Sequence, residues 1–326
     1  MENRFGLVDT SDEERLMSRI RVLSNEVWDG RVTGADVDRW LSNFNGRAFE
    51  VEKERVHALQ LLANFDFFNV ETIRGMLKSM YRDLYRYPLI QELREHLGGT
   101  RDQALLEPEF QRELQATRFL GMGNPSESGA HLLYYFRQIN RLSKTLFIHQ
   151  HEILKKAPGE PDNAVAIAGL KRLVFIDDIM GSGTQAREYS DKLLKYVRAA
   201  DNGSEDPIEI WYFTLFARPD AMRRVRELPF DCVEAVHEID DAERAFSPHS
   251  RVYRTCPDSV TMEDGHHFAK KYGELLVPPF PCGYKDGQLL LGFEHNVPDN
   301  TLPVFWVNET SVDWEPVFPR FNKVLN

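Results

Sequence analysis

A run of four apolar residues, 173–176, constrains the fold of this chain more than any other feature of its sequence. The run does not alternate between apolar and polar residues, so it predicts a strand that is buried on both faces. Asp177 and Asp178 follow it directly, and a loop with two glycines and a helix-forming segment come next. A strand buried on both faces needs helices on both sides, which is the arrangement of a mostly parallel α/β sheet.

The chain between about residues 99 and 238 repeats this alternation of short apolar runs and helical segments. The expected strands are 117–123, 145–150, 172–176, 208–217 and 232–236. The expected helices between them are 128–142, 185–200 and 219–228. This alternation predicts a Rossmann-like, mostly parallel sheet with helices on both faces. The tail from residue 278 is rich in proline and aromatic residues, and we expect loops and short strands that pack back on the sheet.

The first part of the chain has a different period. Apolar residues recur with helical spacing from about residue 11 to residue 97. The spacing predicts an N-terminal helical subdomain, residues 1–98, before an α/β domain, residues 99–326. Trp28 and Trp40 are apolar positions of this subdomain that we expect to remain available to a partner protein.

Charge and cysteine content exclude several classes of protein. The formal net charge of −11 argues against a protein that binds nucleic acid or an anionic membrane through its whole surface. The three cysteines are widely spaced and form neither a disulfide framework nor a CxxC metal site, which favours a reducing cytoplasm. The N-terminus lacks the apolar run of a signal peptide, and no stretch is long and apolar enough to cross a bilayer.

The segment after the buried strand has the chemistry of a sugar-phosphate site. In an open parallel sheet, ligands bind beyond the carboxyl ends of the strands, so Asp177 and Asp178 are expected at that edge, facing water. Glycines let backbone N–H groups approach an anion closely, and the next helix presents its positive N-terminus to the same point. Carboxylates for ribose hydroxyls and a loop for the 5′-phosphate together suit a ribose 5-phosphate group. The expected loop ligands are the backbone N–H groups of Gly181 and Gly183 and the hydroxyls of Ser182 and Thr184.

The stretch "VFIDDIMGSGTQA", residues 174–186, resembles the phosphoribosyl-pyrophosphate signature of type I phosphoribosyltransferases. That signature is an apolar strand, two adjacent acids, two variable residues and a small-Thr-Gly turn, and Ser182 stands where threonine is usual. The resemblance implies that Asp177 and Asp178 face the ribose hydroxyls, as candidate catalytic residues and candidate Mg²⁺ ligands. It also implies that the whole loop from Met180 to Gln185 holds the 5′-phosphate. One departure is Gln185, which stands where the family usually has threonine or serine, and the neighbouring threonine is its candidate substitute.

Two further stretches, 119–140 and 293–320, are similar to the phosphoribosyltransferase-like domain described from bacterial conflict systems. In the first, the resemblance implies a pyrophosphate loop, for which a capped helix without a ligand is the alternative. The implied loop residues are Gly123, Asn124, Ser128 and Gly129. In the second, Asn296 and Trp306 are the candidate contacts to the acceptor base, with ordinary loop packing as the alternative.

The resemblance implies a phosphoribosyltransferase-like protein that binds phosphoribosyl pyrophosphate or a nucleotide with Mg²⁺. It further implies an effector or sensor of a bacterial anti-phage defence system that works beside a partner protein from the same locus. Two alternatives stay open: a nucleotide-binding protein that has lost transfer activity, and an assembly component whose helical part matters more than its pocket. The acceptor base, the trigger and self-association into a homo-oligomer also stay open.

Overall fold

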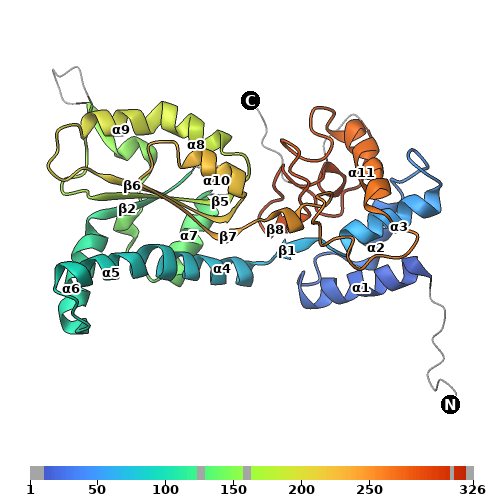
Figure 1. Ribbon diagram of the computed structural model, residues 1–326, viewed down its shortest axis with the longest axis horizontal. Helices are drawn as coiled ribbons and strands as arrows, with labels where there is room; N and C mark the ends of the chain where they lie inside the picture. The colour runs from blue at the N-terminus through green and yellow to red at the C-terminus, as the bar shows by residue number, and fades with distance from the viewer. Residues whose placement is uncertain (1–10, 123–128, 157–162, 309–311, 321–326) are drawn as a thin grey trace, which may run out of the picture. The chain divides into compact units, whose positions relative to one another are not determined.

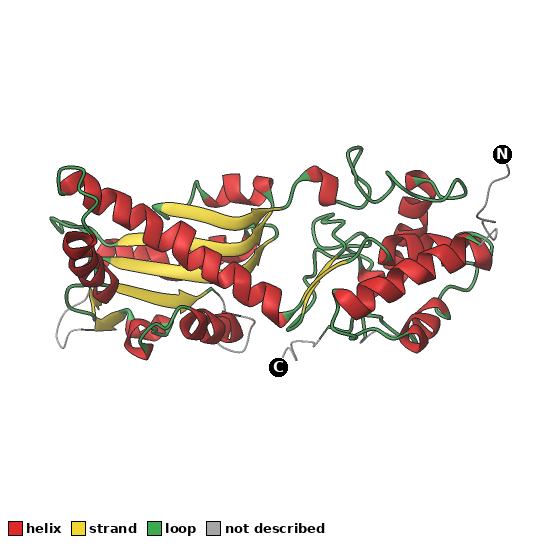
Figure 2. Cartoon of the chain, turned by 90° about the horizontal axis from the view of Figure 1, so that it is seen from below, coloured by secondary structure: helices red, strands yellow, loops and turns green. Residues whose placement is uncertain are grey.

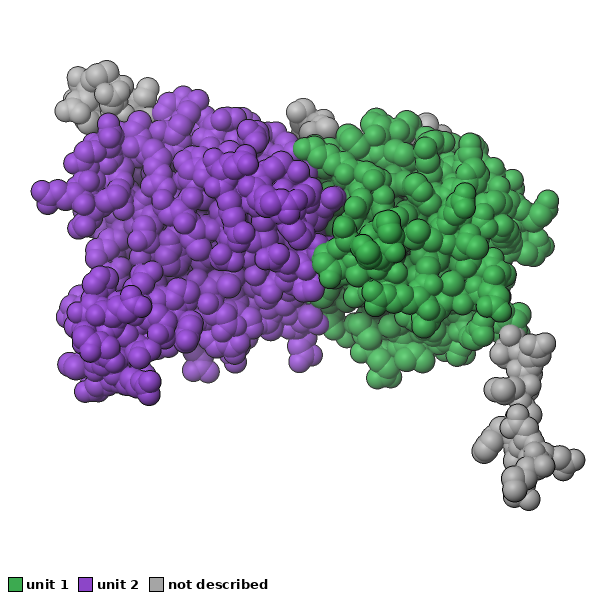
Figure 3. All heavy atoms as spheres, in the orientation of Figure 1, with its two compact units in different colours: residues 1–70, 240–326 green, residues 71–239 purple. Residues whose placement is uncertain are grey.

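The computed structural model describes residues 11–122, 129–156, 163–308 and 312–320. The chain divides into two compact units, which are Met1–Val70 with Asp240–Asn326 (unit 1) and Glu71–Ile239 (unit 2) (Figure 3). The boundaries lie after Val70 and after Ile239, and not at the expected residue 98. The helices just before residue 98 belong to the same unit as the four-stranded sheet. None of the described helices is long and apolar enough to span a membrane.

Unit 2 is built on a sheet of four parallel strands in the order β2-β5-β6-β7. These strands are β2 Thr117–Gly121, β5 Arg172–Met180, β6 Glu209–Ala217 and β7 Cys232–Glu238. A two-stranded antiparallel pair, β3 Leu154–Lys156 and β4 Asn163–Val165, accompanies it. The expected α/β fold with a mostly parallel, Rossmann-like sheet is therefore confirmed.

The strand order changes direction between β2 and β5. On the outer side of β2 the chain forms an isolated parallel bridge between Phe119 and Phe147, and the Ile148 N–H donates to the Phe119 carbonyl at 3.2 Å. The strand expected at 145–150 is reduced to this bridge, which follows a short 3₁₀ turn. The chain thus leaves β2 toward one side, whereas β5, β6 and β7 follow one another on the other side. In doubly wound sheets, this switch point is where ligands bind.

Helices cover both faces of this sheet (Figure 1). One face carries α8 Thr184–Tyr189, α9 Lys195–Ala200 and α10 Pro219–Val225, and its core includes Phe175 and Tyr212. The other face carries α4 Val70–Ser79, α5 Tyr87–His96, α6 Gln103–Gln115 and α7 Gly129–Ile139. Its core is aromatic, since Tyr85 and Phe136 both pack against Phe119. The unbroken apolar run of β5 is explained by this burial on two sides.

One helical run crosses the second face from Val70 to His96 (Figure 2). It consists of α4, a π-helical segment Met80–Arg86 and α5. Pro88 has no N–H and its ring crowds the preceding turn, so the wider π segment directly before it lets the run continue. The remaining short segments are the π-helical Ser190–Leu194 and the 3₁₀ turns Lys144–Leu146, Gln150–Glu152, Asp241–Glu243 and Pro303–Phe305.

Unit 1 combines the first helices of the chain with its C-terminal part. Its helices are α1 Asp12–Glu26, α2 Gly34–Leu41, α3 Val51–Leu62 and α11 Met262–Leu276, and its strands β1 Asp66–Phe68 and β8 Leu291–Phe293 pair in parallel. Thr33 and Ser11 form capping boxes at the starts of α2 and α1. The C-terminal tail packs with these helices, so the expectation that it packs on the sheet is wrong.

Trp28 and Trp40 are not available to a partner, and that expectation is also wrong. Their side chains are 0% and 1% exposed. Trp40 stacks on Phe305 with ring centroids 5.4 Å apart and donates its Nε1–H to the Val304 carbonyl at 2.8 Å. Trp28 packs edge-on against Phe318. The tail supplies both partners, more than 260 residues away in sequence, and helical periodicity cannot reveal such a cover.

Candidate functional site at the carboxyl end of β5

The strand β5 is longer than its apolar run. It continues through Met180 and stays paired with β6, with Asp177 opposite Thr214 and Met180 opposite Ala217. Both aspartates therefore lie within the sheet, and their exposed fractions are only 3% for Asp177 and 9% for Asp178. The expectation that both carboxylates face water is wrong, because β6 is long enough to pair with β5 as far as Met180.

Asp177 lies two residues after Phe175, so both side chains point to the same face of the sheet. This is the face that α8, α9 and α10 cover, since Phe175 belongs to that core. Its Oδ2 accepts a hydrogen bond from the Tyr212 hydroxyl at 3.0 Å, and its Oδ1 accepts from the Asp178 N–H at 3.0 Å. Burial, and then the nearby charge of Asp178, raise the pKa of Asp177 well above its usual value. Burial likewise raises the pKa of Tyr212, and the adjacent carboxylate adds to it. Asp177 thus braces the strand through Tyr212.

Asp178 follows Asp177 at the carboxyl end of β5. Its Oδ1 accepts the Ile179 N–H at 2.7 Å. The end of β2 lies alongside, because Gly121 pairs with Ile176 and the Met122 N–H donates to the Ile176 carbonyl at 3.0 Å. Asp178 therefore occupies the switch-point edge of the sheet. One of the two acids reaches this edge while the other supports the structure.

The expected pyrophosphate loop also follows β2 at this edge. Three of its candidate residues, Gly123, Asn124 and Ser128, lie outside the described residues. The fourth, Gly129, is the first residue of α7. The described residues on either side of this loop are the end of β2, which pairs with β5, and the start of α7. Contact between these four residues and a ligand stays a prediction.

The loop between β5 and α8 has the backbone that the sequence indicates. Gly183 has φ of +74°, in the left-handed region, and a Cβ built there would lie 3.0 Å from Val225 Cγ2. The Ser182 hydroxyl donates to Thr184 Oγ1 at 3.0 Å and accepts from the Thr184 N–H at 3.3 Å. Gly181 is buried and Gln185 is exposed in the first turn of α8. The two hydroxyls and the glycine backbone are therefore gathered at one turn.

Met180 contributes to this loop through its backbone only. Its side chain is buried in the core beneath α8. Its carbonyl accepts the N–H of Arg218, the residue directly after β6. The side chain of Met180 is thus a core residue, and its place in the predicted ligand set rests on the peptide group.

Sequence inspection did not single out Arg224, which also contacts this loop. The residue lies on α10, and its Nη2 donates to the Ser182 carbonyl at 3.2 Å and to Asp220 Oδ2 at 2.9 Å. The segment "ARPDAMRRVRE" contains four arginines directly after β6, and this local excess of positive charge was the available signal. Its relation to the loop depends on how α10 returns to β5, which local sequence does not encode.

Comparison with known families agrees with this geometry. A family model described as PRTase-CE matches residues 37–320. The chain belongs to the PRTase-CE family. As a PRTase-CE protein it contains a phosphoribosyltransferase-like domain, which confirms the resemblance carried by residues 174–186.

Two other comparisons add little to the PRTase-CE assignment. No curated protein matches the chain. A similar solved structure is that of the AQ2163 protein from Aquifex aeolicus, with 11% sequence identity, 69% of this chain and 97% of that chain covered, and a TM-score of 0.26. A likeness at this TM-score carries no argument about fold or function.

The predicted acceptor contacts of this PRTase-CE chain, Asn296 and Trp306, belong to unit 1. Asn296 Oδ1 accepts the Val297 N–H at 2.9 Å, which is typical of a turn. Trp306 donates its Nε1–H to the Thr301 carbonyl at 2.9 Å, and the Arg320 guanidinium lies 5.1 Å from its ring centroid. Their polar groups support unit 1 itself, and contact with an acceptor base stays a prediction.

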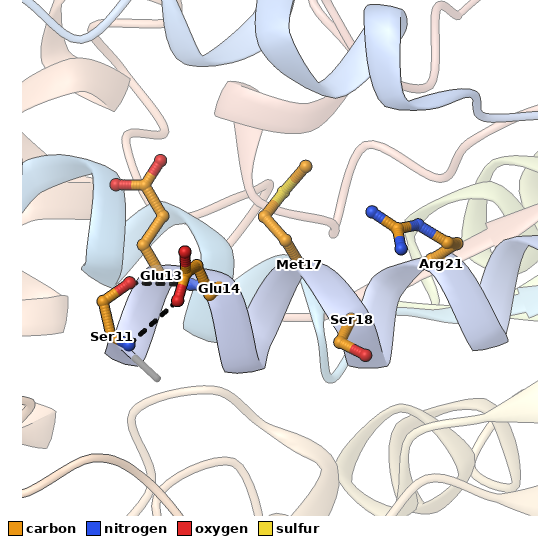
Figure 4. Close-up of a pocket in the computed structure, with 6 residues that line it drawn as sticks. All are labelled: Ser11, Glu13, Glu14, Met17, Ser18 and Arg21. Atoms are coloured by element: carbon orange, nitrogen blue, oxygen red, sulfur yellow. Dashed lines mark hydrogen bonds between the residues drawn. The ribbon is translucent and has the colours of Figure 1, made fainter. Parts of the chain in front are cut away.

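Two cavities lie in unit 1 and contain none of the predicted site residues. One, of about 380 Å³, runs along α1, and its six residues, labelled in Figure 4, come from that helix and its N-cap Ser11. Ser11 and Glu14 there bond to each other in the capping box. The other, of about 320 Å³, lies between α11 and the loop around Cys282. Neither cavity contains a residue of the predicted site, so the β5 edge remains the candidate site.

The two acids differ in how well they suit Mg²⁺. The described residues contain no group of three or more His, Cys, Asp or Glu side chains that could hold a metal ion. Mg²⁺ commonly uses one or two carboxylates together with phosphate oxygens of the substrate, and the position of Asp178 at the switch-point edge fits that arrangement. Asp177 does not fit, because both its oxygens accept hydrogen bonds inside unit 2.

Proposed function

We propose that this protein binds a ribose 5-phosphate group, as part of phosphoribosyl pyrophosphate or a nucleotide, at the carboxyl ends of β2 and β5. The observation that carries the proposal is the position of Asp178 and the glycine loop at the switch point of the sheet. Asp178 is the carboxylate that accepts from the ribose hydroxyls. Residues 181–184 hold the 5′-phosphate through N–H groups and hydroxyls.

Asp178 is also the residue that would help to hold Mg²⁺. When bound, the ion would neutralise charge on the pyrophosphate oxygens of the ligand. Asp177 has a different role in this proposal: its bond to Tyr212 fixes the end of β5, so that Asp178 and the loop keep their places. Binding is the common step for a transferase and for a nucleotide sensor, and product analysis decides between them.

We further propose that this binding serves a bacterial anti-phage defence system, as effector or sensor. This part rests on the resemblance of residues 119–140 and 293–320 to the domain of bacterial conflict systems. The second candidate is an inactive assembly component that works with a partner protein. The burial of Trp28 and Trp40 removes the apolar positions that had favoured a docking role for the first helices, so the binding proposal is the stronger one.

Thermal unfolding with candidate ligands tests the binding proposal. The ligands are phosphoribosyl pyrophosphate, ribose 5-phosphate, NAD and common nucleotides, each with and without Mg²⁺. A ligand at about a hundred times its dissociation constant stabilises the folded state by about 2.7 kcal/mol, which raises the melting temperature measurably. Asp178→Asn should abolish this rise, whereas Asp177→Asn should keep most of it. If no phosphoribosyl ligand stabilises the wild type, the proposed function is wrong.

Phage plating tests the cellular role. Cells carrying the intact locus with the wild-type gene are compared with cells in which the same locus carries Asp178→Asn. Protection that depends on Asp178 supports an effector or sensor that uses this site. Equal protection by both forms favours the assembly component. A locus that never protects, together with nucleotide pools that change on expression, favours a metabolic phosphoribosyltransferase.

A further inference from the structure

The loop after β5 is held from one side by the segment that follows β6. The Arg218 N–H donates to the Met180 carbonyl at 3.0 Å, and the Arg224 guanidinium donates to the Ser182 carbonyl at 3.2 Å. The backbone of Gly183 also lies close to α10. A Cβ added there would lie 3.0 Å from Val225 Cγ2 and 3.6 Å from the Ala221 carbonyl oxygen. Two alternate carbonyls thus bond to the segment after β6, one to Arg218, the N-cap of α10, and one to Arg224 on α10.

The planarity of the peptide group fixes the direction of the N–H groups that follow these two carbonyls. A trans peptide unit is planar, and its C=O and N–H point in opposite directions. Because the carbonyls of Met180 and Ser182 bond to Arg218 and Arg224, the N–H groups of Gly181 and Gly183 point away from those two residues. Within the described part of the chain, neither N–H donates to another protein group. Two donors on one side of a glycine loop are the arrangement that binds an anion.

The guanidinium of Arg224 is itself fixed in place. Asp220 bonds Arg224 Nη2 through Oδ2 at 2.9 Å and Arg218 Nε through Oδ1 at 3.1 Å. Burial raises the pKa of Asp220, but the charges of Arg218 and Arg224 and their hydrogen bonds outweigh it, so the net shift is downward and the carboxylate stays ionised. One carboxylate between two arginines keeps the side chain of Arg224 aligned with the Ser182 carbonyl.

We propose that Arg224 is a positioning residue for the phosphate loop, which holds the Ser182 carbonyl so that the Gly183 N–H faces the 5′-phosphate. The inference rests on the proposed function of the same site. It assigns to α10 a task that the loop sequence alone does not reveal. Arg224 acts on the phosphate through the peptide group, and its charge beside the loop adds a smaller attraction.

The test uses the full-length chain and three variants. Arg224→Gln removes the charge and the strong donor, and Arg224→Lys keeps a charged donor. Arg223→Gln is the matched control, because Arg223 is the preceding residue on α10, is also exposed, and does not bond to the loop in the described structure. Calorimetry with ribose 5-phosphate and Mg²⁺ measures the dissociation constant, and thermal unfolding checks that each variant is folded. Glycine-selective ¹⁵N labelling follows the Gly183 amide signal as ribose 5-phosphate is added.

We expect Arg224→Gln to weaken ribose 5-phosphate binding about tenfold, which is the scale of one lost charge-assisted hydrogen bond. The lysine variant should recover part of this loss, and Arg223→Gln should bind as the wild type does. The ligand-induced shift of the Gly183 amide should shrink in Arg224→Gln. An equal loss in Arg223→Gln would show a general charge effect and overturn the positioning role.

Two further outcomes separate the inference from the proposed function. Wild-type affinity in Arg224→Gln, alongside no binding by Asp178→Asn, overturns the positioning role and leaves the proposed function standing. No binding of ribose 5-phosphate by the wild type overturns both. An Arg224→Gln protein with a lowered melting temperature and a lysine variant without recovery would mark Arg224 as structural, which also overturns the inference.

Discussion

Acid should destabilise unit 1 through one buried histidine, His57 of α3. Its side chain is 1% exposed, and its ring lies between Phe49 and Phe268, with centroids 5.8 Å and 6.3 Å away. Neither ring nitrogen has a hydrogen-bond partner among the described residues. Burial lowers the pKa of His57 to about 4; the charge of Asp264 offsets part of this effect, and that of Lys53 adds to it.

The sign and the size of the effect follow from proton linkage. The fold holds His57 neutral, whereas the unfolded chain takes up a proton near the ordinary pKa of 6.5. The unfolded state therefore binds more protons between these two values, and the free energy of unfolding falls as the pH falls from 6.5 to about 4. A separation of about 2.5 pKa units corresponds to a loss of about 3 kcal/mol, which is complete below the lower value.

Urea unfolding at pH 7, 5.5 and 4 measures this loss. Tryptophan fluorescence reports mainly on unit 1, because four of the five tryptophans belong to it. His57→Leu should be more stable than the wild type at pH 7, since it removes two unsatisfied polar atoms, and its advantage should grow by about 3 kcal/mol at pH 4.

A second variant separates titration from polarity. His57→Gln should lose the same pH dependence without the gain at pH 7, because the glutamine is polar but does not titrate. A constant difference between the wild type and His57→Leu across the three pH values would refute the reasoning.

Three other outcomes are expected. Asp177→Asn should raise the melting temperature at pH 7, because it keeps an acceptor for Tyr212 without a buried charge. The raised pKa of Asp177 means that this advantage grows as the pH rises above 3.8, which melts from pH 3 to 7 will show. Gly183→Val should cost about 1–2 kcal/mol of unfolding free energy, from its positive φ and its contact with Val225, and should remove stabilisation by ribose 5-phosphate in thermal melts. Trp40→Ala should cost about 3–5 kcal/mol in urea unfolding, because the side chain is fully buried.

Local sequence determined the elements and the chemistry of the loop. The apolar run before Asp177 has no polar side that could face solvent. Such a strand is stable only between two layers of helices, as observed. Glycine at position 183 permits the left-handed backbone that the loop adopts, and the side chain of Thr33 caps α2 within three residues of it. In each case, the structure depends on interactions between residues that are close in sequence. The α/β fold and the candidate loop could therefore be predicted.

Tertiary structure alone decided the roles of the individual side chains. The pairing of β5 with β6 placed Asp177 under the hydroxyl of Tyr212, 35 residues away, and left Asp178 at the switch point. Trp40 is buried because the C-terminal tail packs on it, and Arg224 reaches the loop because α10 packs beside the end of β5. Periodicity states which face of an element is apolar, but it does not state what covers that face. That depends on contacts between distant segments, whose free energy is gained only when the whole unit folds.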